Sequence, residues 1–327
     1  MKTERLTADD RAIQRAAKLL RAGRLVAFPT ETVYGLGARA DESAAVQRIF
    51  AAKGRPSQNP LIVHVASIDA ARALSARWST AAERLAEAFW PGPLTLVVEA
   101  RAGAVAPEVT AGGPTVALRR PAHPVAQALL DAVNLPVAAP SANRSTSLSP
   151  TTADHVLKSL NGRIDLVLDG GPTGYGIEST IVDVSRDPAV LLRPGAIPFE
   201  ALAQVVEVVD PGAVIVAPGE VARAPGGLAR HYAPRARVLL VPAALVRAEV
   251  LAQRAAGART GALERAPGSV RGEPHEVLPD DPAGYAEGLY AALHRLDDAG
   301  CAVIVIAEAP EGAGWAAVRD RLRRASA

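Results

Sequence analysis

Short apolar runs, each followed by a polar loop, alternate with amphipathic stretches along the chain up to about residue 208. These runs are rich in β-branched residues and are bounded by Gly, Pro or polar residues, which predicts strands rather than helices. The predicted strands cover 24–28, 61–65, 94–99, 115–118, 137–139, 166–168 and 180–184. Because strands and helices mix without a strict βαβ repeat, the pattern predicts an α/β domain built on a mixed, twisted sheet.

Helices are predicted where apolar residues recur every three or four positions. Ile13, Ala16, Ala17 and Leu20 form such a stripe within a helix over 8–22. Other helices should begin after residues whose side chains can accept a hydrogen bond from the first turn. These are Asp41 before a helix with Val46, Ile49 and Phe50, Ser79 before 81–89, and Thr151 before 152–160, with one more helix over 122–132.

A segment rich in Pro, Gly and Ala, 209–236, divides the chain. It predicts a linker between a larger domain, 1–208, and a smaller one, 237–327. Alternating strands and helices in the smaller domain predict a Rossmann-like α/β unit with a parallel sheet. The strands are expected over 237–241 and 301–307, the helices over 242–256, 285–299 and 315–324, and a loop over 263–283.

Charge and cysteine content exclude several classes of protein. The net charge is only +2, so any contact with a nucleotide or RNA must come from locally placed cations. Cys301 is the single cysteine, which excludes an intramolecular disulfide and a cysteine-based zinc site. The N-terminal segment lacks the apolar core of a signal peptide, and no apolar run approaches the roughly 20 residues that span a bilayer. These features predict a cytoplasmic protein that does not enter a membrane.

Familiar nucleotide and metal motifs are missing. The sequence has no P-loop, no strand–GxGxxG–helix fingerprint, no HExxH and no GxSxG, so side chains from several loops would have to bind any nucleotide. The histidines and carboxylates show no metal-ligand spacing, and we predict no metal held by the protein itself. Mg²⁺ would come with a nucleotide and be held mainly by phosphates and water.

Two polar segments near the start of the chain carry candidate binding residues. The segment 28–37 places Thr32 among other polar groups directly after a strand, where α/β sheets bind ligands; a capping turn into the next helix is the alternative. The segment 52–61 carries Lys53 and Arg55 in a proline-stiffened turn. Because lysine is rare here, with four residues among 36 lysines and arginines, this pair favours a polyphosphate site over a solvated charged turn.

Further polar side chains lie at later strand ends. Arg119 directly follows the predicted strand 115–118, and Arg193 follows the apolar run at 191–192; at such positions a guanidinium can bind a carboxylate or phosphate. Ser141, Asn143 and Ser149 lie in a polar loop after 137–139, and Ser179 precedes 180–184; such short donors bind phosphate oxygens or cap helices. The Trp-Pro-Gly-Pro turn in 89–96 is expected to serve packing. A lone strand histidine such as His64 is, on spacing alone, more often a structural residue than a ligand.

Seven segments in register resemble the YrdC-like family and, more narrowly, its threonylcarbamoyl-adenylate synthases. They are PTETVYGLGA, KGRPSQNPLIVH, WPGPLTLV, TVALRRPAHP, PVAAPSAN, GIESTIVD and LLRPGAI. The linker pattern APG…RHYAP and the ending GWAAVRDRLRRA resemble the long, two-domain form of that family. The resemblance implies a YrdC-like catalytic domain over the first domain.

The resemblance also implies which residues bind the substrates. L-Threonine would be held by Thr32, His64, Arg119, the Ala139 backbone and Ser179, with Arg119 pairing with its carboxylate. ATP would be held by Lys53, Arg55, Asn59, Thr115, Ser141, Asn143, Ser149, Arg193 and Tyr232. Lys53 and Arg55 would be the catalytic pair that stabilises the departing pyrophosphate, and Tyr232 would fold over the nucleotide from the linker.

The activity that the resemblance implies is that of an L-threonylcarbamoyladenylate synthase, a nucleotidyltransferase. It would make threonylcarbamoyl-AMP and pyrophosphate from L-threonine, bicarbonate or CO₂, and ATP with Mg²⁺, without a permanent cofactor. The product would pass to a tRNA threonylcarbamoyl transferase complex that forms threonylcarbamoyladenosine next to the anticodon, and a weak RNA contact is compatible with this.

Two other functions stay open at this point. One is carbamoyl transfer through a carbamoyl-adenylate, against which the absence of Cys-rich zinc modules argues. The other is a double-stranded RNA-binding module without catalysis, against which the near-neutral charge argues.

Overall fold

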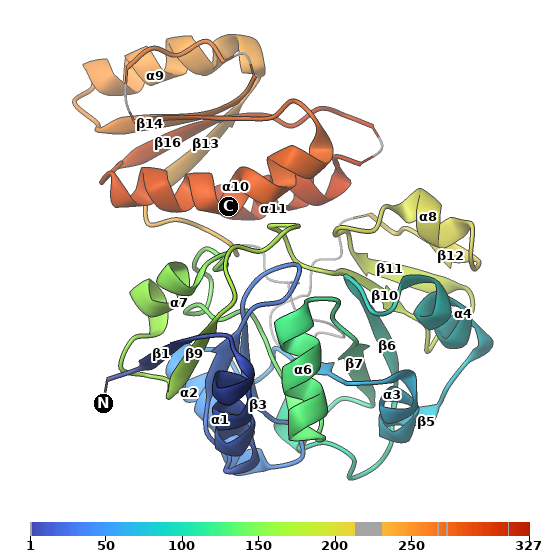
Figure 1. The fold of residues 1–327 in the computed structure, drawn as a ribbon. Helices are drawn as coiled ribbons and strands as arrows, with labels where there is room; N and C mark the ends of the chain where they lie inside the picture. The colour runs from blue at the N-terminus through green and yellow to red at the C-terminus, as the bar shows by residue number, and fades with distance from the viewer. Residues whose placement is uncertain (1, 213–230, 267, 273, 313) are drawn as a thin grey trace.

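The computed structural model describes residues 2–212, 231–266, 268–272, 274–312 and 314–327. Figure 1 shows a larger N-terminal domain and a smaller C-terminal domain that lies against it. Each domain is a sheet covered by helices, as the sequence patterns predict.

The N-terminal domain is built on a mixed sheet, which confirms the predicted α/β class. Its described strands are β1 (Glu4–Thr7), β2 (Val26–Phe28), β3 (Gly35–Arg39), β4 (Ile62–His64), β5 (Ser75–Arg77), β6 (Leu94–Ala100), β7 (Thr115–Arg119), β8 (Val137–Ala138), β9 (Leu166–Asp169), β10 (Thr180–Asp183), β11 (Ala189–Arg193) and β12 (Val208–Val209). Their order across the sheet is β1-β9-β2-β3-β8-β4-β7-β6-β10-β11-β12, with β5 beside β6. The sheet contains both parallel pairs, such as β4–β7, and antiparallel pairs, such as β6–β7.

Helices cover both faces of this sheet (Figure 1). On one face α1 (Asp10–Arg21) packs against α6 (Pro124–Val133), and their apolar stripes share a core with β2 and β9. The opposite face carries α2 (Ser43–Lys53), α3 (Ile68–Leu74), α4 (Thr80–Phe89), α5 (Pro107–Thr110), α7 (Ala153–Leu160) and α8 (Phe199–Ala203). Ile13, Ala16, Ala17 and Leu20 are buried, so the predicted stripe of α1 is the face that packs.

The C-terminal domain has a four-stranded sheet, and all its described pairs are parallel, as predicted. Its elements are β13 (Arg237–Val241), η1 (Ala243–Leu245), α9 (Val246–Ala255), β14 (Thr260–Arg265), β15 (His275–Leu278), α10 (Pro282–Asp298), β16 (Val303–Ala307) and α11 (Ala316–Ser326). The strand order is β13-β16-β14-β15. In Figure 1, α9 covers the outer face, while α10 and α11 lie between this sheet and the N-terminal domain.

The predicted loop over 263–283 is wrong, because this stretch contains the end of β14, all of β15 and the start of α10. β14 carries Gly261 and Ala262 where a strand pattern calls for large side chains, and a Cβ on Gly261 would lie 2.8 Å from the Cys301 sulfur. β15 is a partly exposed edge strand next to β14. Pairing with the neighbouring strands stabilises both elements, and a local pattern does not report that pairing.

Two predicted helix caps are also corrected. Glu42, not Asp41, precedes α2, and its side chain makes no cap hydrogen bond. The Asp41 carboxylate instead accepts hydrogen bonds from Arg39 at 2.8 Å. Thr152, not Thr151, caps α7, and its hydroxyl accepts a hydrogen bond from the His155 N–H. Ser79 caps α4 as predicted.

The segment after Tyr34 forms β3 rather than a turn into the next helix. Its glycines hide the strand pattern, yet they serve packing: a Cβ on Gly37 would lie 2.9 Å from Phe28 on the neighbouring strand. Glycine here allows the two backbones to approach closely.

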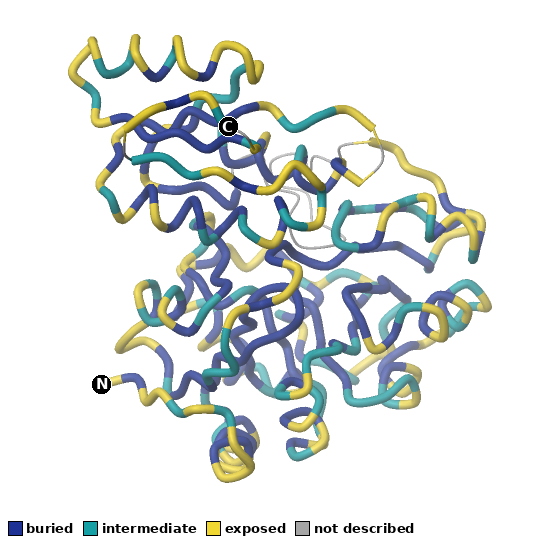
Figure 2. Tube along the Cα trace, turned by 45° about the horizontal axis from the view of Figure 1, so that its top comes forward, coloured by how far each residue is buried: buried dark blue, intermediate teal, exposed yellow. Residues whose placement is uncertain are grey.

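The two domains share an apolar core. Val33, Leu148 and Ile177 of the first domain pack in one cluster with residues of α10, α11 and β16, among them Leu289 and Leu322. Figure 2 shows this contact region as buried, whereas exposed residues recur along α9. Among the described residues, no helix has both the length and the apolar character needed to cross a bilayer.

A histidine pair lies across the same interface. His155 of α7 and His294 of α10 stack with ring centroids 3.8 Å apart. Burial, with Lys158 adding to it, lowers the pKa of His155 to about 4; burial and the His155 ring lower the pKa of His294 to about 3. The other charged groups near the pair are Asp154, Arg295 and Asp298.

Acid should therefore weaken the fold. Both folded-state pKa values lie below the about 6.5 of an unfolded histidine, so the unfolded chain takes up protons first as the pH falls. The stability from the neutral pair is complete above pH ~6.5 and is lost as the pH falls towards the folded-state pKa values, by up to about 1.4 kcal/mol per pH unit for each histidine and by less than that for half-buried His155. Urea unfolding at about pH 7.5 and about pH 5 measures the loss. His155→Phe keeps a ring but cannot titrate, so it should remove the His155 contribution to this slope and leave that of His294; an unchanged slope would contradict the role of the pair.

Candidate active site

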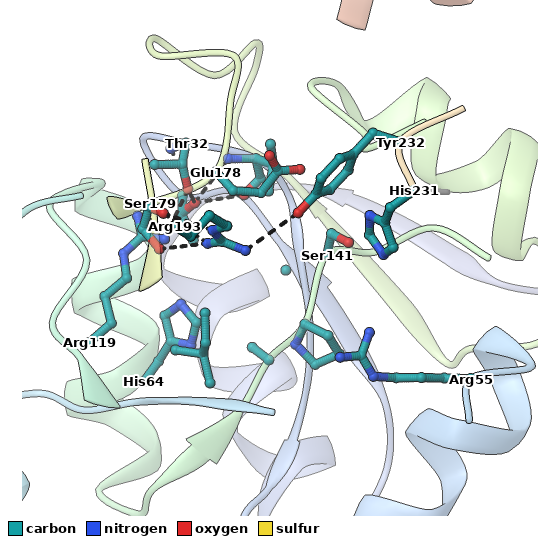
Figure 3. A pocket seen from close by; sticks show the side chains of 16 residues that line it. Thr32, Arg55, His64, Arg119, Ser141, Glu178, Ser179, Arg193, His231 and Tyr232 are labelled. Atoms are coloured by element: carbon teal, nitrogen blue, oxygen red, sulfur yellow. Dashed lines mark hydrogen bonds between the residues drawn. The ribbon is translucent and has the colours of Figure 1, made fainter. Parts of the chain in front are cut away.

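A pocket lies between the N-terminal domain and the segment that follows residue 230, and the labelled side chains surround a common space (Figure 3). Sixteen residues line it: Thr30, Thr32, Val33, Gly35, Arg55, Ile62, His64, Arg119, Ala139, Pro140, Ser141, Glu178, Ser179, Arg193, His231 and Tyr232. The cavity measures about 50 Å³, well below the roughly 150 Å³ of a cavity that accepts a benzene-sized ligand. The described arrangement is therefore closed, and a nucleotide requires it to widen.

Three strand ends meet at this pocket because of the sheet topology. β6 runs antiparallel to β7 and parallel to β10, so the end of β7 and the start of β10 lie at the same edge. β11 is antiparallel to β10, and Arg193 is paired with Ile181 there. The topology thus brings Arg119, Ser179 and Arg193 together from positions far apart in the sequence.

Arg119 is buried and its charge is already balanced. Its guanidinium donates to Glu31 Oε1 at 2.7 Å, to Thr32 Oγ1 at 2.9 Å and to the Gly92 carbonyl at 3.3 Å. Thr32 Oγ1 in turn lies 2.9 Å from Thr30 Oγ1. An arginine has five N–H donors, so two remain for a ligand, in a fork that suits a carboxylate.

Ser179 and Arg193 form a second, connected pair. Arg193 donates to the Ser179 carbonyl at 2.9 Å and to its hydroxyl at 3.1 Å, and the Ser179 hydroxyl lies 2.8 Å from Thr95 Oγ1. The turn after Arg193 passes close to this strand, since a Cβ on Gly195 would lie 2.3 Å from the Thr180 nitrogen. Glycine is needed here for the close approach of the two backbones.

Arg55 is a buried cation without a carboxylate at ion-pair distance among the described residues. It donates to the carbonyls of Asn59 at 3.2 Å and Pro60 at 3.0 Å. Burial and nearby Arg193 lower the pKa of Arg55 to about 10, so it stays charged near neutral pH. A buried charge that lacks an anion favours binding of an anionic ligand.

The prediction that Lys53 shares a turn with Arg55 is wrong. Lys53 is the last residue of α2, and Gly54 ends this helix in the left-handed conformation. Its Nζ is buried and donates to the carbonyls of Ser141 and Asn143, both at 2.5 Å. Burial and Arg55 hold the pKa of Lys53 well below its usual range. Lys53 therefore holds the loop that carries Ser141, and in this closed arrangement it does not line the pocket.

His64 lies in the pocket wall, 3% exposed, with its ring edge-on to Phe28. Burial and Arg119 lower the pKa of His64 to about 3, so the ring is neutral at physiological pH. Its Nδ1 is buried and has no hydrogen-bond partner in the described part of the chain. A neutral ring next to Arg119 fits a small polar ligand whose carboxylate Arg119 binds.

Tyr232 covers the pocket from the side of the C-terminal domain. It is buried, has a φ of 59°, and its hydroxyl accepts a hydrogen bond from Arg193 at 3.5 Å. Figure 3 shows its ring and His231 opposite Arg193.

Several predicted residues lie outside the lining. Asn59 is buried near Arg55, and neither atom of its amide has a partner among the described groups. Asn143 accepts from the Ser141 hydroxyl and donates to the Ser147 carbonyl, so it shapes the loop. Ser149 donates to Glu178. Thr115 begins β7 and Arg119 ends it. At about 3.3 Å per residue the two lie about 13 Å apart along the strand, so Thr115 does not reach the pocket.

The sequence patterns did not single out Glu178, His231 or Glu31. Glu178 lines the pocket, and Glu31 binds Arg119. Glu178 stands next to Ser179 in GIESTIVD, yet its main partners come from the other domain. Within the described ranges, no three His, Cys, Asp or Glu side chains gather in a group that could hold a metal ion.

Comparison with known proteins agrees with this arrangement. Residues 18–195 match the family model described as "Telomere recombination" (Sua5, yciO and yrdC), and residues 197–327 match "Threonylcarbamoyl-AMP synthase, C-terminal domain". The threonylcarbamoyl-AMP synthase of Pyrococcus abyssi is 44% identical over 96% of this chain and 94% of its own. That of Bacillus subtilis is 41% identical over 99% and 95%.

A crystal structure of P. abyssi Sua5 complexed with L-threonine superposes with a TM-score of 0.93, at 41% identity, over 99% of this chain and 97% of that one. The likeness spans both domains, which is the long, two-domain form indicated by the linker and the C-terminal motif. The chain belongs to the threonylcarbamoyl-AMP synthase family.

Proposed function

We propose that this chain is an ATP-dependent nucleotidyltransferase that makes threonylcarbamoyl-AMP and pyrophosphate from L-threonine, bicarbonate and ATP. One observation carries the proposal: the pocket joins a charge-balanced arginine to an uncompensated one. Arg119, held by Glu31 and Thr32, suits an amino-acid carboxylate. Arg55 has no carboxylate at ion-pair distance within the described ranges, so a polyphosphate would supply its counter-ion.

L-Threonine would occupy the part of the pocket around Arg119. Its carboxylate would bind the two remaining donors of Arg119, with the other contacts coming from Thr32, neutral His64, the Ala139 backbone and Ser179. Selection of threonine over serine would depend on a methyl contact, which limits the preference to about 1–3 kcal/mol.

ATP would occupy the part around Arg55 and Arg193. In addition to these two arginines we assign Lys53, Asn59, Thr115, Ser141, Asn143, Ser149 and Tyr232 to the nucleotide. Asn59 has a buried amide with unused hydrogen-bonding capacity. In the closed arrangement Lys53 holds the loop that carries Ser141. Thr115 lies at the start of β7, so it would contact the nucleotide only if the site widened in that direction. Mg²⁺ would enter with ATP, bound by phosphates and water.

The reaction would take place in two steps. The threonine amine adds to CO₂ derived from bicarbonate and loses a proton, which gives a carbamate. A carbamate oxygen then bonds to the α-phosphorus of ATP, and the bond to the bridging oxygen breaks, so pyrophosphate leaves with that electron pair. The chain's residues would contribute by holding the reactants in line and by neutralising charge. Arg55 would stabilise the departing pyrophosphate, and Lys53 would do so once the site has widened.

The product would serve a tRNA threonylcarbamoyl transferase complex. We place the enzyme in the cytoplasm, where ATP and the tRNA acceptor are found. Any RNA contact would be weak, because a net charge of +2 provides no strong field.

Pyrophosphate release from ATP, with L-threonine and bicarbonate each supplied or withheld, tests this function. We expect release only when both are present. Release that does not depend on threonine, or no release at all, would contradict the proposal.

Two controls separate the other functions. If carbamoyl phosphate replaces threonine and bicarbonate and still supports pyrophosphate release, the chain is a carbamoyl transferase. A gel shift with double-stranded RNA that falls steeply with salt, without ATP turnover, would indicate an RNA-binding module.

A further inference from the structure

Two side chains of the C-terminal domain reach the wall of the active-site pocket. The Glu178 carboxylate accepts hydrogen bonds from Tyr290 Oη at 3.1 and 3.2 Å and from Arg321 Nε at 2.7 Å. Tyr290 belongs to α10 and Arg321 to α11, more than a hundred residues beyond Glu178. The third donor is the Ser149 hydroxyl, at 2.5 Å. Of the three donors that the described residues provide to this pocket carboxylate, two therefore come from outside the N-terminal domain.

The same two side chains pack around Tyr232. The Arg321 guanidinium carbon lies 5.2 Å from the centre of the Tyr232 ring, and the Tyr290 ring lies 6.0 Å from it. Tyr232 has a left-handed φ of 59°, which a tyrosine adopts only at a cost of about 1–3 kcal/mol. These contacts hold a strained backbone so that the Tyr232 ring stays over the pocket.

The charge of Arg321 also matters to the pocket. Burial alone would raise the pKa of Glu178, but Arg321 and Arg193 outweigh it and hold that pKa below its usual value, so the carboxylate is ionised. An ionised carboxylate beside a polyphosphate repels it unless a cation neutralises it. Arg321 is fully buried, and the Pro194 carbonyl and Asp320 fix its guanidinium at 3.0 and 2.6 Å.

We infer that Tyr290 and Arg321 are positioning residues of the nucleotide half of the active site: they hold and neutralise Glu178 and provide the surface on which Tyr232 packs. The C-terminal domain is thereby a structural part of the ATP site rather than an appendage. The inference rests on the proposed function in assigning that half of the pocket to ATP.

Tyr290→Phe tests the hydrogen bond without removing the ring. We expect the KM for ATP to rise about fivefold, while the KM for L-threonine stays within about twofold. Tyr285→Phe is the matched control, because Tyr285 is equally buried on the same helix and its hydroxyl has no partner among the described residues. Equal effects of the two variants, or equal increases in both KM values, would overturn the inference.

Arg321→Met tests the charge. We expect the KM for ATP to rise about tenfold or more, and the double variant Arg321→Met with Glu178→Gln to return within about threefold of the parent, because the repelling carboxylate is gone. A double variant no better than Arg321→Met would overturn the charge argument. Should Arg321→Met fail to fold, Glu178→Gln alone still decides: it removes the carboxylate and leaves the Arg321 cation, so we expect ATP to bind at least as tightly as to the parent. A dissociation constant for ATP raised about tenfold in Glu178→Gln would overturn the charge argument.

Calorimetric titration of the full-length variants with ATP alone separates this inference from the proposed function. If the parent binds ATP but releases no threonine-dependent pyrophosphate, the proposed function fails while the dissociation constants still test Tyr290 and Arg321. If ATP binds the parent and every variant equally, or does not bind the parent at all, the inference is wrong.

Discussion

Replacement of Arg55 by methionine is expected to reduce turnover by about 1000-fold with little change in stability. Arg55 lines the pocket and has no carboxylate partner in the described structure, so a polyphosphate would be its counter-ion. Removal of a preorganised donor from a site of developing charge costs about 100- to 1000-fold. For the fold, relief from burying an uncompensated charge offsets the loss of two hydrogen bonds to carbonyls, so we expect a net change within about 1 kcal/mol.

Steady-state pyrophosphate release and urea unfolding measure the two effects. Arg48→Met, at an exposed position of α2, is the matched control and should change neither. Turnover of the Arg55 variant within about threefold of the parent at saturating ATP would contradict a phosphate-binding role.

Replacement of Arg119 by methionine is expected to damage both binding and fold. The variant leaves Glu31 ionised and buried without its cation, and breaking a buried ion pair costs about 3–5 kcal/mol. The pair is tight, with 2.7 Å between Arg119 Nη2 and Glu31 Oε1 and both side chains largely buried. Loss of the carboxylate fork should also raise the KM for L-threonine about 100-fold.

A second substitution separates these effects. Arg119→Met combined with Glu31→Gln removes the unpaired charge, so urea unfolding should recover most of the lost stability while the KM for threonine stays high. Recovery of threonine affinity in the double variant would contradict direct binding by Arg119. No recovery of stability would contradict the ion-pair argument.

Arg55 and Arg119 thus show why residue type alone does not assign a role. Both are buried arginines in one pocket, and the sequence places both at suitable polar segments. Only the structure distinguishes them, because Glu31 lies against Arg119 and no described carboxylate lies against Arg55.

Much of the fold follows from local patterns. The stripe of α1, the Ser79 cap and the β-branched runs of β4, β6 and β10 depend on neighbouring residues, and the structure confirms them. β3, β14 and β15 were not predicted, since their glycines and polar residues fit a sheet only through adjacent strands.

The same limit applies to the site. Thr32, His64, Arg119 and Ser179 each stand out as polar groups after or within an apolar run, and the structure brings them to one pocket. Glu178 is held by hydrogen bonds from Tyr290 and Arg321, 112 and 143 positions away. No spacing in the sequence indicates such a contact. Lys53 stands out as a rare lysine, yet the groups that its ammonium contacts depend on the position of the Ser141 loop, which the sequence does not show.

The most direct test of the proposed chemistry is the identity of the product. The purified chain is incubated with ATP, Mg²⁺, L-threonine and ¹³C-labelled bicarbonate, and the nucleotides are analysed at once by mass spectrometry. We expect an adenylate that contains threonine and one labelled carbon, formed together with pyrophosphate and absent when threonine is withheld. ATP converted to AMP and pyrophosphate without the labelled adenylate, or a labelled adenylate that lacks threonine, would contradict it.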